Sequence, residues 1–320
     1  MKGLALPPVL AVPPVLALLV ALPLLGASNY VTGVGVTVFV YIVAALSLNL
    51  VYGLLGLLSL AHTAFWGIGG YFAAVTVMDL GWSFWLAVPA GGLFAGIVAL
   101  AIGYPALRLN RHSFVVVTLV FSLLTFLVAR DWMSVTRGPM GIPGLPSPGF
   151  FGTPIDDPAD FYYLALAFMV LALALLHVFF TSRIADTMRA ICQNEPLVRS
   201  QGINPTPYKL FGFFLSALFT GMAGAILVFN LRIIDPLIFD FYYMQAFLIM
   251  VIVGGRGSFW GVVIAGAAMS VLPELLRVSG DLRMVIYGLI LLAVVTVAPT
   301  GFAGWLRERR NARLRLELRQ

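Results

Sequence analysis

Three polar side chains that could bind a small solute, Ser59, His62 and Thr63, lie within five residues of an otherwise apolar stretch. Their hydroxyl and imidazole groups both donate and accept hydrogen bonds. If the stretch crosses a membrane, such groups either hydrogen-bond to a neighbouring helix or line a pathway for a polar solute. For His62 the sequence leaves both interpretations open.

Glycines surround this polar cluster. Gly53 and Gly56 precede it, and Gly67, Gly69 and Gly70 follow it. Glycine allows two helices to approach closely, or a helix to break. Unwound backbone at membrane depth is tolerated only where it is buried in protein or faces water, so we predict that a broken third helix borders a substrate pathway. The predicted pathway residues are Ser59, His62, Thr63, Gly67, Gly69 and Gly70.

A second polar segment, SRIADTMRAICQNEPLVRSQGINPTPY, occupies residues 182–208. We expect a helix in its first part with Ile184, Met188 and Ile191 on one face, because these residues are three or four positions apart. Pro196 permits a break and the start of a second short helix. The segment is either an ordinary amphipathic connector or a coupling helix that docks on a separate ATPase, and its composition does not decide between the two.

Several kinds of catalytic site are missing from the sequence. The only lysines, Lys2 and Lys209, do not follow a glycine, so there is no phosphate-binding GxxxxGK[ST] loop. The hydrolase motifs HExxH and GxSxG are also absent. A single cysteine, Cys192, forms no intramolecular disulfide, and the three histidines are too scattered to suggest a metal site. We therefore expect a chain that is not an enzyme and holds no cofactor or metal of its own.

The composition indicates that these residues belong to a membrane protein. The 320 residues are 61% hydrophobic and only 10% charged, whereas soluble domains carry about 25% charged residues. A helix needs about 20 apolar residues to cross the ~30 Å hydrocarbon layer, and several stretches reach that length. The sequence therefore predicts an all-α polytopic membrane protein with a single transmembrane domain, residues 1–320. The ten predicted spans are residues 4–26, 31–52, 54–78, 83–106, 113–129, 161–181, 209–229, 241–254, 258–276 and 284–299.

The positive charges indicate the orientation of these spans. With the N-terminus in the cytoplasm, 14 of the 19 lysines and arginines lie in cytoplasmic segments, as the positive-inside rule requires. Both termini and residues 182–208 are then cytoplasmic, and the long loop of residues 130–160 is periplasmic. Residues 300–320 form a basic tail with six arginines, which we expect to rest on anionic lipid headgroups and not to bind nucleic acid.

The first predicted span has two interpretations. Lys2, an apolar run and Gly26-Ala27-Ser28 together resemble a secretory signal peptide. Prolines at positions 7, 8, 13 and 14 interrupt the run, however, and it is long for a signal core, which favours a retained helix. Cleavage would leave nine spans and a periplasmic N-terminus.

Four stretches of the chain resemble the permeases of branched-chain amino-acid ABC transporters, specifically the LivM-type permeases. They are LNLVYGLLGLLSLAHTAFWGIGGY, TRGPMGIPGLP, MRAICQNEPLVRSQGINPTPYKLFGFFLSALFTGMAGAI, and GGRGSFWGVVIAGAAM followed by LPELLR. Together they extend over residues 48–277, and the third is the most specific. The tripeptide FWG occurs at 65–67 and again at 259–261, which hints at the inverted repeats that many transporters contain.

The resemblance implies a type II-like ABC importer permease with inverted five-helix repeats, in the inner membrane of a bacterium. Its implied partners are a LivH-type sister permease that completes a heterodimer, two cytoplasmic ATPases that use ATP and Mg²⁺, and a periplasmic substrate-binding protein. The positions of the motif residues imply a role in ATPase coupling for Arg189, Asn194, Glu195 and Gly202.

Both the substrate and the class of transporter have alternatives. The resemblance implies leucine, isoleucine and valine or related small solutes, but the family also contains importers of urea, short amides and aromatic acids. A stand-alone secondary transporter or channel would need acidic residues at mid-membrane depth, and the nearest candidate is Glu274, close to the end of a span. A membrane enzyme is a weaker alternative, because the hydrolase motifs are missing.

Overall fold

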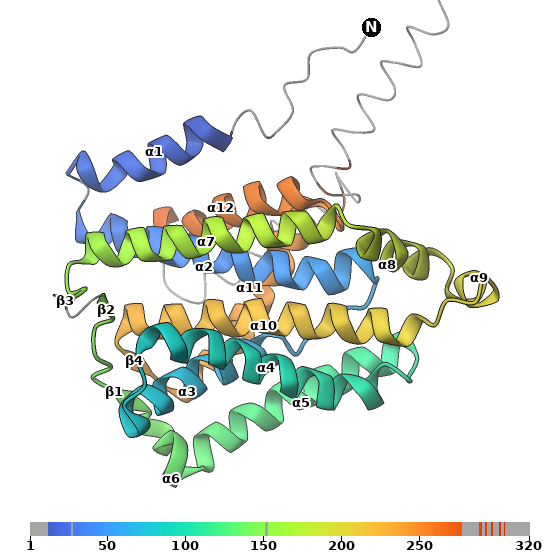
Figure 1. The fold of residues 1–320 in the computed structure, drawn as a ribbon, viewed down its shortest axis with the longest axis horizontal. Helices are drawn as coiled ribbons and strands as arrows, with labels where there is room; N and C mark the ends of the chain where they lie inside the picture. The colour runs from blue at the N-terminus through green and yellow to red at the C-terminus, as the bar shows by residue number, and fades with distance from the viewer. Residues whose placement is uncertain are drawn as a thin grey trace, which may run out of the picture.

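The computed structural model of the chain describes residues 12–26, 28–150, 153–276 and the positions 288, 289, 292, 296, 301 and 304. These residues form a helical bundle with small strands at one end (Figure 1). The α-helices are α1 (Val12–Leu24), α2 (Asn29–Asn49), α3 (His62–Leu80), α4 (Phe84–Ala106), α5 (Arg111–Asp131), α6 (Met133–Thr136), α7 (Pro158–Phe180), α8 (Arg183–Gln193), α9 (Glu195–Ser200), α10 (Pro205–Leu231), α11 (Phe241–Gly254) and α12 (Phe259–Leu276). The shorter elements are a π-helix η2 (Leu50–Leu54), 3₁₀-helices η3 (Gly138–Met140) and η4 (Pro236–Phe239), and strands β1 (Ile142–Pro143), β2 (Gly149–Phe150), β3 (Thr153–Pro154) and β4 (Ile233–Ile234).

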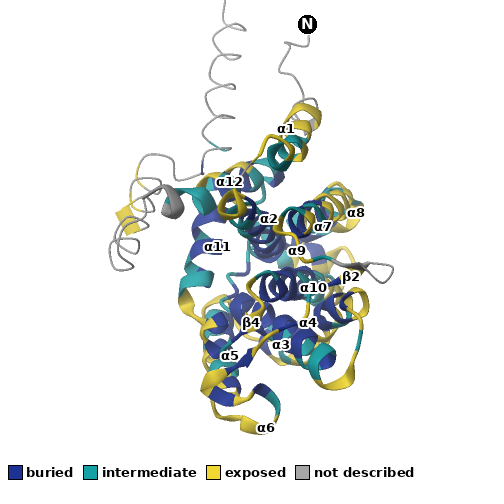
Figure 2. Ribbon diagram, turned by 90° about the vertical axis from the view of Figure 1, so that its left-hand side faces the viewer, coloured by how far each residue is buried: buried dark blue, intermediate teal, exposed yellow. Residues whose placement is uncertain are grey.

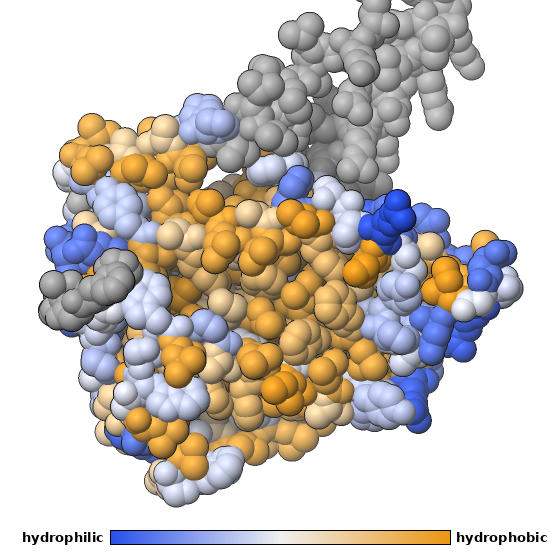
Figure 3. Space-filling view, viewed as in Figure 1, coloured by the Kyte–Doolittle hydropathy of each residue, from blue (hydrophilic) through white to orange (hydrophobic). Residues whose placement is uncertain are grey.

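Many of these helices are suited to a bilayer. In the described part of the chain, six helical segments are long and apolar enough to cross a membrane, and α1 and α12 hold shorter apolar helices. Figure 3 shows a broad hydrophobic surface between two hydrophilic ends, as a membrane-spanning bundle requires. The prediction of ten spans is not established by this count. Residues 4–11 of the first predicted span, most of the tenth (284–299) and nearly all of the basic tail (300–320) lie outside the described residues.

The centre of the bundle consists of α2, α3 and α10, its most buried helices, and α4 packs against α3 and α10 (Figure 2). Small residues allow α10 to lie close to its neighbours. A Cβ atom on Gly96 of α4 would meet the ring of Phe214 at 2.7 Å, and one on Gly221 of α10 would meet Ala95 at 2.8 Å. Such contacts are the usual basis of helix packing in membranes, where apolar burial gives little driving force.

The predicted third span, residues 54–78, is wrong at its N-terminal end. The helix α2 continues as the π-helix η2, and the backbone is then non-helical from Leu55 to Ala61 before α3 begins at His62. We call residues 55–61 the unwound segment. Gly56 has a φ of +69°, which favours glycine and ends the helical path. The break therefore contains Ser59 and ends directly before His62 and Thr63, whereas Gly67 to Gly70 lie inside a regular helix.

The two ends of the bundle differ. At one end, which we call the strand end, β1 pairs with β4, β2 pairs with β3, and the indole of Trp85 donates to the Gly149 carbonyl oxygen at 2.7 Å. At the other, the α8 end, α8 and α9 are separated by a break at Asn194, as the sequence predicts. The predicted apolar face of α8 is partly wrong, because Ile184 is exposed and Ala185 takes its place beside Met188 and Ile191.

Candidate functional site

The unwound segment is held by side chains of α5. The amide of Leu60 donates to Thr118 Oγ1 at 3.1 Å, and the carbonyl oxygen of Leu60 accepts from Ser122 Oγ at 2.7 Å. These two hydroxyls replace hydrogen bonds that a continuous helix would have made. Backbone polar groups without a partner are costly inside a bilayer, so α5 stabilises the break.

The predicted polar cluster is buried within the chain, with Ser59 and His62 fully enclosed and Thr63 almost so. His62 Nε2 lies 2.6 Å from Ser216 Oγ on α10, and Ser216 Oγ donates to the Ser47 carbonyl oxygen of α2 at 2.6 Å. Because the single hydroxyl proton goes to Ser47, Nε2 of His62 must be the donor in the other contact. The His62 imidazole and the Ser216 hydroxyl therefore link three helices, α3, α10 and α2.

The remaining polar groups of the cluster also have partners. Thr63 Oγ1 donates to Ser122 Oγ at 3.4 Å, and Ser59 Oγ accepts from the Ala61 amide at 3.3 Å. Within the described part of the chain, Nδ1 of His62 is buried and has no hydrogen-bond partner. The structure gives His62 an interhelical hydrogen bond, and its contact with a solute stays a prediction.

The three glycines predicted beside the pathway lie in α3 at close helix contacts. A Cβ atom on Gly67 would overlap the ring of Phe239, and one on Gly69 would overlap the backbone of Gly221 in α10. A Cβ atom on Gly70 would meet Val228 at 2.9 Å. These residues allow α3 to pack directly against η4 and α10.

Asn49 is a residue of the site that the sequence did not single out. It is fully buried where α2 becomes η2, and its Oδ1 accepts from the Gly257 amide at 2.8 Å while its Nδ2 donates to the Ser258 carbonyl oxygen at 3.2 Å. The same turn brings the guanidinium of Arg256 to 4.3 Å from the centre of the Tyr52 ring. One side chain thus joins the π-helix to the turn between α11 and α12. The only signal in the sequence is an amide within an apolar run, and its partners lie more than 200 positions away.

The helix α8 packs directly on the unwound segment. A Cβ atom on Gly56 would lie 2.6 Å from Cys192 Sγ, so only glycine fits there without a shift. Arg111, the first residue of α5, donates from Nη2 to the Cys192 carbonyl oxygen at 3.1 Å. Movement of α8 would therefore act on both the unwound segment and α5.

The predicted coupling residues lie on α8, α9 and the turn that follows. Arg189 pairs with Asp186 at 2.6 Å and donates to the Phe180 carbonyl oxygen at 2.7 Å, which fixes α8 to the end of α7. Asn194 caps α9 by accepting from the Leu197 amide at 3.1 Å. Gly202 has a φ of +79°, a conformation that residues with a Cβ atom rarely adopt.

Glu195 joins α9 to α10. Its Oε2 lies 2.6 Å from Lys209 Nζ, and its Oε1 lies 2.8 Å from an Arg199 nitrogen. Partial burial raises the pKa of Glu195, but the hydrogen bonds and charges of Lys209 and Arg199 outweigh it, and the resulting pKa lies below the ordinary value. Glu195 lies outside the membrane-spanning helices and is ionised at neutral pH.

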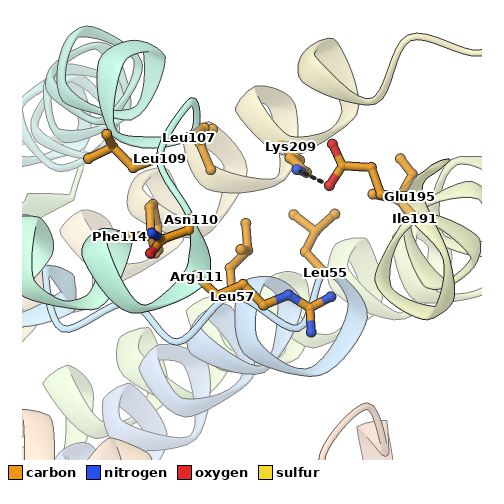
Figure 4. A pocket seen from close by; sticks show the side chains of 10 residues that line it. All are labelled: Leu55, Leu57, Leu107, Leu109, Asn110, Arg111, Phe114, Ile191, Glu195 and Lys209. Atoms are coloured by element: carbon orange, nitrogen blue, oxygen red, sulfur yellow. Dashed lines mark hydrogen bonds and ion pairs between the residues drawn. The ribbon is translucent and has the colours of Figure 1, made fainter. Parts of the chain in front are cut away.

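A pocket of about 290 Å³ separates these elements. Its lining comes from the unwound segment, the turn between α4 and α5, the α8–α9 pair and the first turns of α10 (Figure 4). Six of the lining side chains are apolar, and the others are Asn110, Arg111, Glu195 and Lys209. The coupling segment and the polar cluster are thus connected through the unwound segment, with a small cavity between them.

Comparison with known families decides what kind of protein has this arrangement. The family model described as the permease component of branched-chain amino-acid transport systems matches residues 30–295, more than four fifths of the chain. The chain belongs to this permease family. The permease is a multi-pass membrane protein and a transport component rather than an enzyme.

Curated relatives of the permease include LivM and LivH proteins. It is 30% identical over 285 residues to the high-affinity branched-chain amino-acid permease protein LivM of Salmonella typhimurium, covering 82% of this chain and 67% of the relative, and the LivM of Escherichia coli K12 gives the same values. It is 29% identical over 284 residues to LivH of Salmonella typhimurium, with 82% of this chain and 91% of the relative covered. No solved structure matches the permease significantly.

The described part of the permease offers no group of three histidine, cysteine or acidic side chains that could hold a metal ion. Its charged groups instead concentrate at the two ends of the bundle, and neutral hydrogen-bonding groups lie between them.

Proposed function

We propose that this permease is the membrane subunit of an ATP-driven importer in the bacterial inner membrane, and that it moves branched-chain amino acids or related small solutes. The observation that carries the proposal is the direct contact of α8 with the unwound segment, through Cys192 and Gly56. This contact gives a surface helix a mechanical route to the polar cluster in the bundle. The names of the LivM and LivH relatives support the substrate class.

The permease family implies an assembly of several subunits. The similarity to both LivM and LivH supports a heterodimer with a LivH-type sister permease. One of two ATPases would bind residues 182–208 on the cytoplasmic side, and both ATPases would hold ATP and Mg²⁺. A periplasmic binding protein would dock over residues 130–160 at the strand end, which the positive-inside rule places outside. Ten spans in two inverted repeats would complete the fold.

The residues suggest how ATP hydrolysis reaches the substrate. Closure of the ATPases would push α8 and α9, through the coupling residues Arg189, Asn194, Glu195 and Gly202. Cys192 and Met188 would pass the movement to Gly56 and Gly212, which they contact. The unwound segment would then shift relative to α5 and open a route beside α3. The route would be bordered by Ser59, His62, Thr63, Gly67, Gly69 and Gly70.

Uptake into proteoliposomes tests this proposal. The permease is reconstituted with its sister, the ATPases and the loaded binding protein, and the entry of labelled leucine, isoleucine, valine and urea is measured. We expect uptake of the branched-chain amino acids only when ATP and all subunits are present, and no ATP hydrolysis by the permease alone. Uptake without ATP, or ATP turnover by the purified permease, would contradict the proposal.

A further inference from the structure

The pocket at the α8 end combines charges of both signs with an apolar lining. Lys209 and Glu195 form an ion pair on one side, and Figure 4 shows the guanidinium of Arg111 on the other side of Leu55. At about 290 Å³, the pocket lies just below the ~300–1,000 Å³ typical of small-molecule sites. Its size and lining suit a small amphiphile with an apolar part.

The charged groups of the pocket have unused hydrogen-bonding capacity. Arginine has five N–H donors, and within the described part of the chain Arg111 uses one of them, toward Cys192. Asn110 uses its Oδ1 to cap α5, at 2.8 Å from the Ser113 amide, which leaves its NH₂ group for a ligand. The Glu195 carboxylate accepts one bond at each oxygen from protein, and each oxygen can accept another.

We propose that this pocket is a binding site for a free α-amino acid with an aliphatic side chain, entered from the cytoplasm. The carboxylate of the ligand pairs with Arg111, its ammonium group pairs with Glu195, and its side chain lies against Leu55, Leu57 and Leu109. The cytoplasmic location and the choice of amino acid rest on the proposed function. The free donors of Arg111 suit the carboxylate of a ligand, and the remaining acceptor capacity of Glu195 suits its ammonium group, so both ends of a zwitterion find a partner.

Occupation of the pocket has a mechanical consequence. A ligand there would tie α9, which carries Glu195, to the first residue of α5 and to the unwound segment. Because α8 contacts the same two elements, the ligand opposes any movement of the coupling helices relative to the bundle. The imported amino acid would therefore slow its own import when it accumulates in the cytoplasm.

Calorimetric titration of the full chain in lipid nanodiscs tests the site without any need for transport. The probes are L-leucine and three compounds that each lack one of its features. Glycine lacks the aliphatic side chain, 4-methylpentanoate lacks the ammonium group, and isoamylamine lacks the carboxylate. We expect saturable binding of L-leucine and binding about tenfold weaker or more for each probe that lacks one of the three features. The variant Arg111→Gln should bind L-leucine about tenfold or more less tightly than wild type, but its affinity for isoamylamine should be unchanged.

Two further variants separate a local effect from a loss of folding. The control variant Arg108→Gln removes the same charge three positions earlier in the chain. Arg108 is exposed, stacks on Tyr104 and does not line the pocket, so this variant should bind L-leucine normally. Leu109→Trp keeps all charges but fills the pocket, and it should abolish binding. Should Arg111→Gln fail to fold, Leu109→Trp decides the matter alone.

These experiments test the binding site and the proposed function separately. Absence of leucine binding, equal binding by Leu109→Trp, or binding of short-chain phosphatidylethanolamine in place of leucine would overturn the site. In proteoliposomes, leucine is also placed on the side of the membrane that carries the ATPases. This leucine should reduce uptake by wild type and by the Arg108→Gln variant, but not by Leu109→Trp. Leucine binding by a permease that transports no amino acid would leave the site standing and remove the proposed function.

Discussion

At the scale of single residues, buried polar side chains of the permease satisfy backbone groups at two irregular places, the break between α2 and α3 and the turn between α11 and α12. Asn49 satisfies two backbone groups of the α11–α12 turn, and Thr118 and Ser122 satisfy both groups of Leu60. A hydroxyl or amide buried among apolar helices is tolerated where it has such a partner. The sequence could place polar residues in the membrane, but it could not say which distant backbone each one serves.

The Asn49 side chain should be important for stability. We expect Asn49→Leu to lower the free energy of unfolding by about 2 kcal/mol or more, because it leaves the Gly257 amide and the Ser258 carbonyl oxygen buried without partners. Thermal unfolding in detergent measures the change. Asn230→Leu is the matched control, since the Asn230 side chain makes no hydrogen bond within the described residues and should tolerate the change. Equal loss in both variants would contradict the role of Asn49.

The Glu195 ion pairs should make stability depend on pH in one direction. The folded pKa lies below the ordinary value of 4.5, so the stabilisation is fully present above pH 4.5 and is lost as the pH falls through the lowered pKa. We expect the melting temperature of wild type to exceed that of Glu195→Gln at neutral pH, and the difference to disappear in acid. A difference that grows as the pH falls would reverse the sign and refute the ion pairs as its cause.

At the scale of elements, the sequence predicted helices well wherever an apolar run has clear ends. The predicted spans 83–106, 241–254 and 258–276 match α4, α11 and α12 within one residue at each end. The glycines predicted a break in the third span, but they could not place it at residues 55–61, because LGLLSLA is as apolar as the helices around it. Its irregular path depends on α5 and α8, which lie far away in the sequence. The glycines of α3 gave a misleading signal, since close packing and a break both favour glycine.

The close contact between α3 and α10 should be sensitive to a single methyl group. We expect Gly69→Ala to destabilise the permease by about 1–3 kcal/mol, because the new Cβ atom would overlap the Gly221 backbone, which cannot move aside as a side chain can. Gly33→Ala is the control, because Gly33 lies in α2 with open space around its Cα, and the change should be neutral or stabilising by up to about 1 kcal/mol. Chemical unfolding of both variants measures the difference. Similar behaviour of the two variants would contradict the contact.

The turn after α9 should be sensitive to its backbone conformation. Gly202 has open space around it, so Gly202→Val is strained only through its φ of +79°. We expect this variant to insert normally but to lose most of the ATPase stimulation by loaded binding protein, because α9 is displaced. Gly202→Asn should retain the stimulation, since asparagine tolerates this conformation. Wild-type stimulation in the valine variant would show that the turn plays no part in coupling.

At the scale of the whole molecule, the polar cluster at the junction of the unwound segment and α3 is enclosed by this chain alone. Ser59 and His62 are fully buried between α2, α5 and α10, so a solute cannot touch them in the described arrangement. Transport beside α3 therefore requires the unwound segment to move, and α8 is the surface element that packs against it. An importer supplied by a binding protein needs only weak contacts along its route, because a deep site would retain the substrate. Few polar groups and many small residues meet that requirement.

The last prediction concerns when this region becomes accessible to water. Cysteine is placed at position 59 or 63 in a chain that carries Cys192→Ala, and the assembled transporter is treated with a small water-soluble thiol reagent. We expect no reaction at rest, because both positions are buried, and reaction during turnover with ATP and loaded binding protein. Ala99→Cys is the control, since Ala99 is equally buried in α4 and should stay protected in both conditions. Protection of 59 and 63 in every state would place the route elsewhere. Reaction at rest would instead mean that the segment opens without ATP, and that α8 does not control it.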